Sequence, residues 1–124
     1  MYTSIVVTVP ANTLKADPLR VQMPLSRSII VYFAFYMYPE SVGYTHFAVE
    51  HLSRQLFPFD VEEDYSIPGQ LIEYHPDVRL EKLPYDLDIV AWNIDDRFPH
   101  DIHIFIGTKR KTLMGVLEQV FAGA

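Results

Sequence analysis

The 124-residue chain contains no cysteine, few glycines and no long apolar run. Without cysteine the chain has no disulfide, no thiolate nucleophile and no cysteine-ligated metal. Its five glycines are spread singly, and neither a glycine-rich phosphate loop nor a Gly-x-Ser-x-Gly nucleophile elbow is present. The longest apolar stretch, residues 29–38, has about ten residues, whereas a membrane helix needs roughly 20. We therefore expect no membrane segment and none of these catalytic sites.

Basic residues are also scarce, with 10 Lys and Arg against 16 Asp and Glu, for a formal net charge of -6. A nucleic-acid binder gains affinity by neutralising phosphates with Lys and Arg, so we expect no nucleic-acid partner. The one basic cluster, residues 109–111, is too short to change that expectation. The chain begins Met1-Tyr2-Thr3-Ser4 with no basic stretch, which predicts no secretory signal and a cytoplasmic or assembled intracellular product.

What the chain does have is a repeated alternation of polar and apolar residues, as in residues 101–106. A period of two is typical of a β-strand with one buried face and one wet face. The predicted strands are residues 2–9, 19–25, 28–38, 44–52, 70–75, 78–83, 85–92 and 101–106. The last two strands are predicted to form a hairpin, while residues 47–56 are left open between strand and helix. The pattern predicts an all-β fold, a jelly-roll-like or Ig-like β-sandwich of seven to eight short strands.

The strand at residues 28–38 is unusual because both of its faces are apolar or aromatic. One face is predicted to hold Ile29, Val31, Phe33, Phe35 and Met37; the other holds Ile30, Tyr32, Ala34, Tyr36 and Tyr38. Such a strand is central in its sheet, or its second face meets a partner. We predict Tyr32, Tyr36 and Tyr38 as interface residues, the alternative being a second buried layer of the same sandwich.

The C-terminal residues change character, and they divide the chain into a β-sandwich domain, 1–108, and a tail, 109–124. Thr112 is a candidate cap for a short helix. The apolar residues of the tail are Leu113, Met114, Val116, Leu117, Val120 and Phe121. We interpret the tail as a docking helix that binds a neighbouring subunit, the alternative being a helix that closes its own sandwich. The first strand could likewise pair with the free edge of a neighbour.

Polar clusters offer weaker candidates for chemistry. The pairs His100 and His103, and His46 and His51, have opposite parity on strands, so neither pair converges on a metal and no metal is expected. The acidic segment 60–64 and the segment 93–96 carry oxygen ligands of the kind that bind calcium, but they lack the EF-hand spacing and are interpreted as solvated turns.

Two alternatives to a purely structural role remain at this stage. Asp86 and Asp88 lie two apart on a strand and share a face, which would suit a hydrolase using two carboxylates. Tyr85 and Trp92 would instead stack on a sugar in a carbohydrate-binding module, which predicts a monomer with exposed aromatics on one wet face. Catalysis by Asp86 and Asp88 is the weaker of the two, and we expect that the protein is not an enzyme.

Three segments, residues 9–13 (Val-Pro-Ala-Asn-Thr), 55–58 (Gln-Leu-Phe-Pro) and 91–100, carry a resemblance. The chain resembles small single-domain β-sandwich proteins encoded among the structural genes of tailed phages, over most of its first 106 residues. The resemblance implies a virion component assembled in the host cytoplasm, such as a capsid decoration or head-tail accessory protein, with a jelly-roll-like fold. It also implies no active site and no cofactor. The expected partners are the protein itself, as a homo-oligomer such as a trimer, and a major structural protein of the particle.

Overall fold

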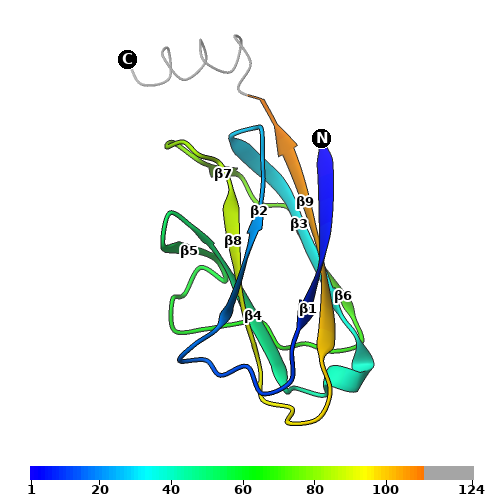
Figure 1. The fold of residues 1–124 in the computed structure, drawn as a ribbon. Helices are drawn as coiled ribbons and strands as arrows, with labels where there is room; N and C mark the ends of the chain where they lie inside the picture. The colour runs from blue at the N-terminus through cyan, green and yellow to red at the C-terminus, as the bar shows by residue number, and fades with distance from the viewer. Residues whose placement is uncertain (111–124) are drawn as a thin grey trace, which may run out of the picture.

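In a computed structural model, residues 1–110 are described, and they form two antiparallel β-sheets packed face to face (Figure 1). The elements are β1 (Tyr2–Val9), β2 (Leu19–Met23), β3 (Ile29–Met37), the 3-10 helix η1 (Pro39–Ser41), β4 (Thr45–His51), β5 (Arg54–Phe57), β6 (Leu71–Tyr74), β7 (Val78–Arg79), β8 (Leu87–Asn93) and β9 (His100–Lys109). The expectation of an all-β sandwich is confirmed. The described residues form nine strands rather than seven or eight, because β5 is a separate strand. None of the helical structure described here could cross a membrane.

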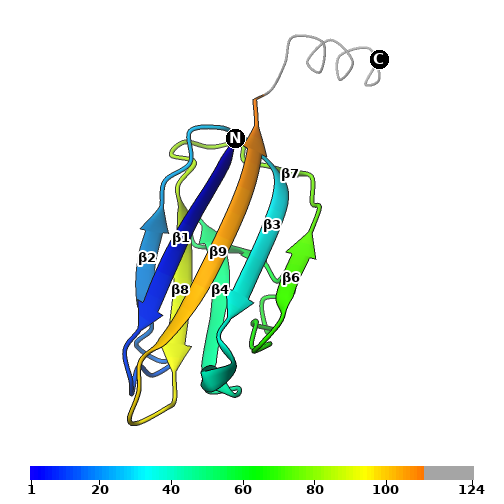
Figure 2. The same cartoon turned by 90° about the vertical axis from the view of Figure 1, so that its right-hand side faces the viewer.

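The order of the strands shows how the chain is rolled up. One sheet has the order β1-β9-β3-β6, with β7 also paired to β3, and the other has the order β2-β8-β4-β5 (Figure 2). The strands therefore pair from the outside of the chain inward: β1 with β9, β2 with β8, β3 with β6, and β4 with β5. The predicted hairpin between residues 85–92 and 101–106 is wrong, because β8 and β9 lie in different sheets.

The physical reason for this error lies in the connection between β8 and β9. The Asn93 side chain donates hydrogen bonds to the carbonyl oxygens of Val9 and Phe98, at 3.3 and 3.0 Å, and its Oδ1 accepts one from the backbone N–H of Asp95. These bonds link the end of β8 to the end of β1 in the opposite sheet. Residues 94–99 thereby cross from one sheet to the other instead of forming a hairpin turn.

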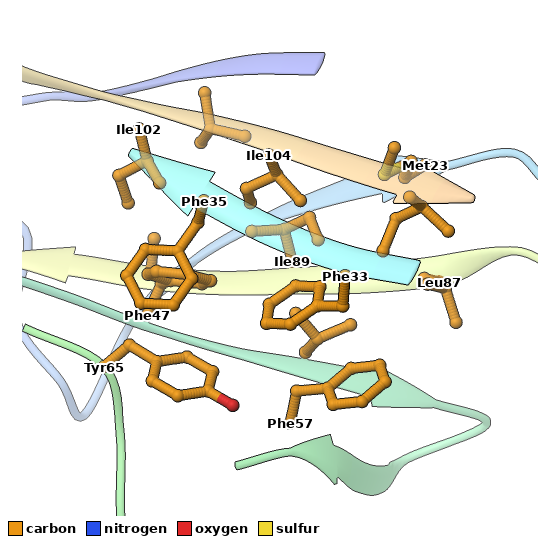
Figure 3. Packing of buried hydrophobic residues seen from close by; sticks show 14 of the residues in the cluster. Met23, Phe33, Phe35, Phe47, Phe57, Tyr65, Leu87, Ile89, Ile102 and Ile104 are labelled. Carbon is orange, nitrogen blue, oxygen red and sulfur yellow. The ribbon is translucent and has the colours of Figure 1, made fainter. Parts of the chain in front are cut away.

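The core lies between the two sheets and is built by the alternation seen in the sequence (Figure 3). Phe33 stacks on Phe57 with ring centroids 4.4 Å apart, and Phe35 meets Phe47 edge to face at 4.9 Å. Burying one such side chain contributes about 1.5–3 kcal/mol to stability. Ile104 on β9 belongs to the same cluster and is fully buried.

Strand β3 departs from the prediction at one point. The register of β3 against β9 shifts between Ile30 and Tyr32, and the extra residue of a β-bulge reverses the parity of the strand. Ile30 therefore joins the core together with Phe33, although the two were assigned to opposite faces. After the bulge the prediction holds, since Phe33, Phe35 and Met37 all face inward.

The open question about residues 47–56 is resolved in favour of strands. Strands β4 and β5 pair antiparallel around a two-residue turn at Leu52 and Ser53, whose φ angles are 50° and 69°. Two positive φ angles in a row are the geometry of the type I′ turns that join tight hairpins. The segment predicted as a strand at 78–83 is shorter than expected, because only Val78 and Arg79 pair with β3.

Candidate functional site

The outer side of the β1-β9-β3-β6 sheet is lined by aromatic and aliphatic side chains. The register places Tyr2, Gly107 and Tyr32 in one cross-strand row. The rows that follow along the strands are Ser4, Phe105, Ala34 and Glu73; then Val6, His103, Tyr36 and Leu71; and finally Thr8 and Asp101. We call the side chains of the first three rows the aromatic face.

Aromatic contacts organise the first row. Tyr2 meets Tyr32 edge to face at 5.8 Å, and Tyr32 also lies 5.5 Å from the ring of His75. The Tyr32 hydroxyl donates a 3.1 Å hydrogen bond to Glu73 Oε2, and desolvation together with this bond raises the pKa of Tyr32. Gly107 makes room for both rings, since a Cβ atom there would lie 2.8 Å from Tyr32 Cβ.

Three large apolar side chains of the aromatic face are strongly exposed: Tyr2 by 77%, Leu71 by 53% and Val6 by 51%. No Lys or Arg belongs to the four rows. With strands about 4.8 Å apart and rows about 6.6 Å apart, the eleven positions of the face cover on the order of 350 Å². That footprint, which includes the polar positions Ser4, Glu73 and His103, is comparable to the largest surface patches of soluble monomers, about 300–600 Å², and is roughly half of the ~800 Å² that one partner contributes to a standard interface.

A groove of about 850 Å³ continues from the fourth row to the end of the sandwich where β9 begins. It is lined by Thr8, Tyr38, Glu40, Asp95, Phe98, Pro99, His100 and Asp101. Tyr38 is 40% exposed and Phe98 is 62% exposed. No Lys or Arg lines the groove, whereas three carboxylates do. We call this feature the acidic groove.

The loop beside the acidic groove is held by its own side chains. Asp95 Oδ1 accepts hydrogen bonds from the backbone N–H groups of Arg97 and Phe98, and Asp95 Oδ2 lies 2.8 Å from His100 Nε2. These contacts, the one from Arg97 first, lower the pKa of Asp95. An ionised carboxylate only accepts, so Nε2 of His100 carries the proton. In segment 93–96, which was interpreted as a solvated turn, Asn93 is fully buried, and the side chains of Asn93 and Asp95 each accept a hydrogen bond from the backbone N–H two residues on.

The side chains around this pair are already engaged in local hydrogen bonds. His100 Nε2 is occupied by Asp95, and the neighbouring hydroxyl of Thr8 donates to Asp101 Oδ1 at 2.7 Å. No group of three or more His, Asp or Glu side chains among residues 1–110 is placed to hold a metal ion.

The structure separates the predicted interface residues into two groups. Tyr32 and Tyr36 lie on the aromatic face, where both are half-buried, and Tyr38 lies beside Tyr36 on the acidic groove, with ring centroids 5.2 Å apart. The predicted tail residues Leu113, Met114, Val116, Leu117, Val120 and Phe121 lie outside the described residues.

The residues assigned to glycan binding do not form a common exposed surface. Trp92 is only 8% exposed, because its ring stacks on His46 at 5.5 Å and the Lys15 ammonium lies 5.3 Å from its centroid. Tyr85 precedes the opposite end of β8 and packs against the core. The expectation that Trp92 is an exposed aromatic is therefore wrong.

The remaining candidates are accounted for by local contacts. His100 and His103 face opposite sides of β9, as predicted, and His103 stacks on Phe105 at 4.1 Å. His46 and His51 have separate partners, the carboxylate of Asp64 and the carbonyl of Pro84. Asp86 lies outside β8, while Asp88 pairs across the sheet with Gln22 and Glu50.

Four large apolar or aromatic residues of the aromatic face were not singled out from the sequence: Tyr2, Val6, Leu71 and Phe105. Their alternation with inward residues was visible, but an outward position on a strand was interpreted as merely wet. Each strand contributes only one or two of these side chains, so the face can be recognised only when the outward residues of neighbouring strands are considered together.

The segments that carry the phage resemblance, residues 9–13, 55–58 and 91–100, form hydrogen bonds that stabilise loops. Gln55 Nε2 contacts three carbonyl oxygens, those of Pro58, Asp60 and Glu63, at 2.9–3.0 Å. Thr13 Oγ1 donates to the carbonyl of Pro10 at 2.7 Å, and its backbone pairs with that of Asn93. These residues position the connections at the ends of the strands.

Comparison of the chain with models of protein families and with curated protein sequences finds no match.

Proposed function

We propose that this protein is a non-enzymatic structural subunit that works through protein–protein interfaces, and that its main interface is the aromatic face. The single observation that carries the proposal is the exposure of this face. An antiparallel sheet that borders water normally places polar residues outward, but here Tyr2, Leu71 and Val6 are the most exposed large apolar side chains within the described strands. Apolar surface that the described part of the chain does not cover is stabilised by contact with another protein.

The setting that best suits such a subunit is a virus particle, as a capsid decoration or head-tail accessory protein. This part of the proposal rests on the resemblance of residues 9–13, 55–58 and 91–100 to tailed-phage structural proteins. In a particle the subunit would contact further copies of itself and a major structural protein.

The same proposal includes a jelly-roll version of the sandwich. In a jelly roll, a long antiparallel ribbon is rolled into two sheets, and this architecture is common in viral capsid and lectin domains. Four nested pairings support it: β1 with β9, β2 with β8, β3 with β6, and β4 with β5. The two-residue β7 is an addition at the edge.

The experiment is to compare Val6→Lys with a matched control, Gln22→Lys, by light scattering and sedimentation. Val6 faces outward from β1 on the aromatic face, and Gln22 faces outward from β2 in the opposite sheet. Both variants add one positive charge to an exposed strand position. We expect the wild-type chain and Gln22→Lys to form an oligomer, and Val6→Lys to weaken association about 100-fold because it buries an unpaired charge.

Two results would count against the proposal. One is a monomeric wild-type chain at every concentration. The other is an oligomer that Val6→Lys leaves unchanged. Thermal unfolding of both variants serves as the check that the substitution acts on the interface, because an exposed strand substitution usually changes stability by less than about 0.5 kcal/mol.

A carbohydrate-binding module is the second candidate, and one observation favours it. A hollow of about 540 Å³ on the aromatic face is lined by Tyr2, Tyr32 and Phe105 together with Thr3 and Ser4. Aromatic rings beside hydroxyl groups are suited to stacking on a sugar. The candidate predicts a monomer whose intrinsic tyrosine fluorescence changes when a neutral oligosaccharide is added, and whose response is lost in Tyr2→Ala.

A further inference from the structure

The two ends of the sandwich carry opposite charge. At one end, where β9 begins, the acidic groove presents Glu40, Asp95 and Asp101 between the apolar side chains of Tyr38 and Phe98. Among the described residues, Glu40 has no ion-pair partner within 4 Å, and the Asp101 carboxylate accepts only the hydroxyl of Thr8. These two carboxylates therefore have room for a further cationic partner.

The other end, where β9 finishes, gathers most of the basic residues of the chain. Of the ten Lys and Arg residues, six lie in the strand ends and connections at this end: Arg27, Arg54, Arg79, Lys82, Lys109 and Arg110. We call this feature the basic end. A hollow of about 340 Å³ brings Arg54, Arg79 and Lys82 together with a single acidic residue, Glu81. Of these three cations only Arg79 has an ion pair within the described residues, a loose one of 3.7 Å to the exposed Asp77.

The acidic groove and the basic end lie at opposite ends of the strands. Strand β9 runs from His100 at the acidic groove to Lys109 at the basic end, and Lys109 is level with Ile29 and Arg79 in the sheet (Figure 2). Ten residues of strand span about 30 Å, several Debye lengths at physiological salt. The two charges therefore do not neutralise each other within one copy.

We infer that the basic end of one copy docks onto the acidic groove of the next copy, so that the subunits associate head to tail. This inference rests on the proposed role as an assembly subunit and names the partner for a second surface. Charge complementarity selects the occupant, because the groove has acidic and aromatic walls and the same chain carries a cluster of basic side chains at its other end, of which Arg54 and Lys82 have no ion pair within the described residues. Guanidinium and ammonium groups pair with carboxylates and stack on aromatic rings.

Head-to-tail docking has a consequence for symmetry. The contact joins two different surfaces, so it is heterologous, and it generates a ring if the rotation closes and a filament if it does not. The aromatic face runs along the side of the molecule between the two ends, and it stays available for its own contact when the ends are occupied.

The experiment uses charge reversal at each end of the full-length chain. The acidic-end variant is Glu40→Lys with Asp101→Lys, and the basic-end variant is Arg54→Glu with Lys82→Glu. Each reversal changes the charge by two, so the net charge moves from -6 to -2 in the first variant and to -10 in the second. A matched control, Glu62→Lys with Glu63→Lys, also moves the net charge to -2, but these residues lie on the connection after β5 and line neither the acidic groove nor the hollow at the basic end.

At low salt we expect the wild-type chain and the control to associate, and each end variant alone to lose about 100-fold in association, because like charges then face each other. Mixing the two end variants should restore association, since each contact again joins opposite charges. The wild-type contact should also weaken steeply toward 1 M salt, where the Debye length falls to about 3 Å.

The outcomes separate this inference from the proposed function. Association that is indifferent to salt and to both end variants, yet lost in Val6→Lys, would overturn head-to-tail docking and leave the aromatic face as the interface. A mixture of end variants that fails to associate, while each folds as judged by its thermal transition, would also overturn the inference. A wild-type chain that stays monomeric at low and high salt would overturn both proposals.

Discussion

The two outer surfaces of this sandwich differ although both belong to antiparallel sheets of similar size. On the four-stranded sheet, the outward side chains include Arg20, Glu50 and Asp88, and Arg20 pairs with Glu50 at 3.2 Å. The one large aromatic there, Trp92, is covered by His46 and the Lys15 ammonium. On the five-stranded sheet Tyr2 is exposed, and the outward aromatics Tyr32, Tyr36 and Phe105 are only half-buried within the described residues.

In the function that we propose, this difference separates the surface that stabilises the fold from the surface that binds a partner. The outer face of the four-stranded sheet carries charged side chains, and its large aromatic ring is covered by other residues of the chain. That face therefore needs no partner to be stable. The five-stranded sheet leaves apolar surface exposed, which costs free energy in the isolated subunit and favours association. Substitutions on one surface, compared with substitutions on the other, test this difference.

The largest effect is expected from truncating the covered aromatic. Trp92→Ala removes a nearly buried ring, and we expect a loss of about 3 kcal/mol in the free energy of unfolding, as for large-to-small changes in a core. Tyr2→Ala removes a ring that is 77% exposed, and its cost should be about 0.5 kcal/mol. Urea denaturation of both variants measures the contrast, and equal losses would contradict the distinction between a covered and an uncovered surface.

A smaller effect is expected at the glycine beneath the aromatic face. Gly107→Ala places a Cβ atom 2.8 Å from Tyr32 Cβ and 2.7 Å from the Tyr2 ring, so the strand or the rings must shift. We expect a cost of about 1–2 kcal/mol in thermal or denaturant unfolding, as for other overpacked sites.

The same variant has an internal control. Tyr2 is a mobile surface side chain, whereas Tyr32 Cβ is fixed to its backbone. The double variant Tyr2→Ala with Gly107→Ala should therefore recover only part of the loss. Full recovery would mean that the Tyr2 ring alone, and not the backbone of β3, limits the space above Gly107.

A further, pH-dependent effect is expected at the acidic groove. The folded pKa of Asp95 lies below the ordinary value of 3.8, so the unfolded chain binds this proton more readily at acid pH. The stabilisation is present above pH 3.8 and is lost as the pH falls through the folded pKa. Asp95→Asn should lower stability at neutral pH and flatten its decline below about pH 4, as followed by denaturant unfolding across pH.

Asp101→Asn is the matched control for that prediction. It removes a neighbouring carboxylate that accepts a hydrogen bond from the exposed Thr8 hydroxyl only. Its acid decline should follow the wild-type chain. An unchanged decline in Asp95→Asn would show that Asp95 is not the group responsible.

Much of the core could be predicted from the alternation in the sequence. Phe33, Phe35 and Met37 on β3 were assigned to one face, and all three belong to the core cluster. A period of two identifies the residues that share a face, and burial then selects the apolar set. The alternation involves only neighbouring residues, so it predicts the buried face wherever no bulge interrupts the strand.

Strand pairing and the bulge could not be predicted in the same way. Two strands that are neighbours in sequence, β8 and β9, lie in different sheets because Asn93 joins its loop to Val9 across the sandwich. The bulge near Ile30 depends on the register with β9, which is more than 70 residues away. Both features arise from contacts between distant segments, so no window of the sequence contains them.

The candidate site was only partly predictable for the same reason. Tyr32 and Tyr36 were recognised because they lie on one strand. Tyr2, Phe105 and Leu71 complete the face only after three other strands are placed beside β3. The acidic groove likewise combines η1, the start of β9 and the connection before it, which are far apart in the chain.

The most direct test of the central claim is hydroxyl-radical footprinting of the full-length chain as a function of concentration. Tyr2 and Phe59 are both exposed aromatics, 77% and 84%, but Tyr2 lies on the aromatic face and Phe59 lies on the connection after β5. We predict that oxidation of Tyr2 and Leu71 falls as the protein assembles, while oxidation of Phe59 stays constant. Protection of Phe59 with no change at Tyr2 would contradict the assignment of the aromatic face as the interface.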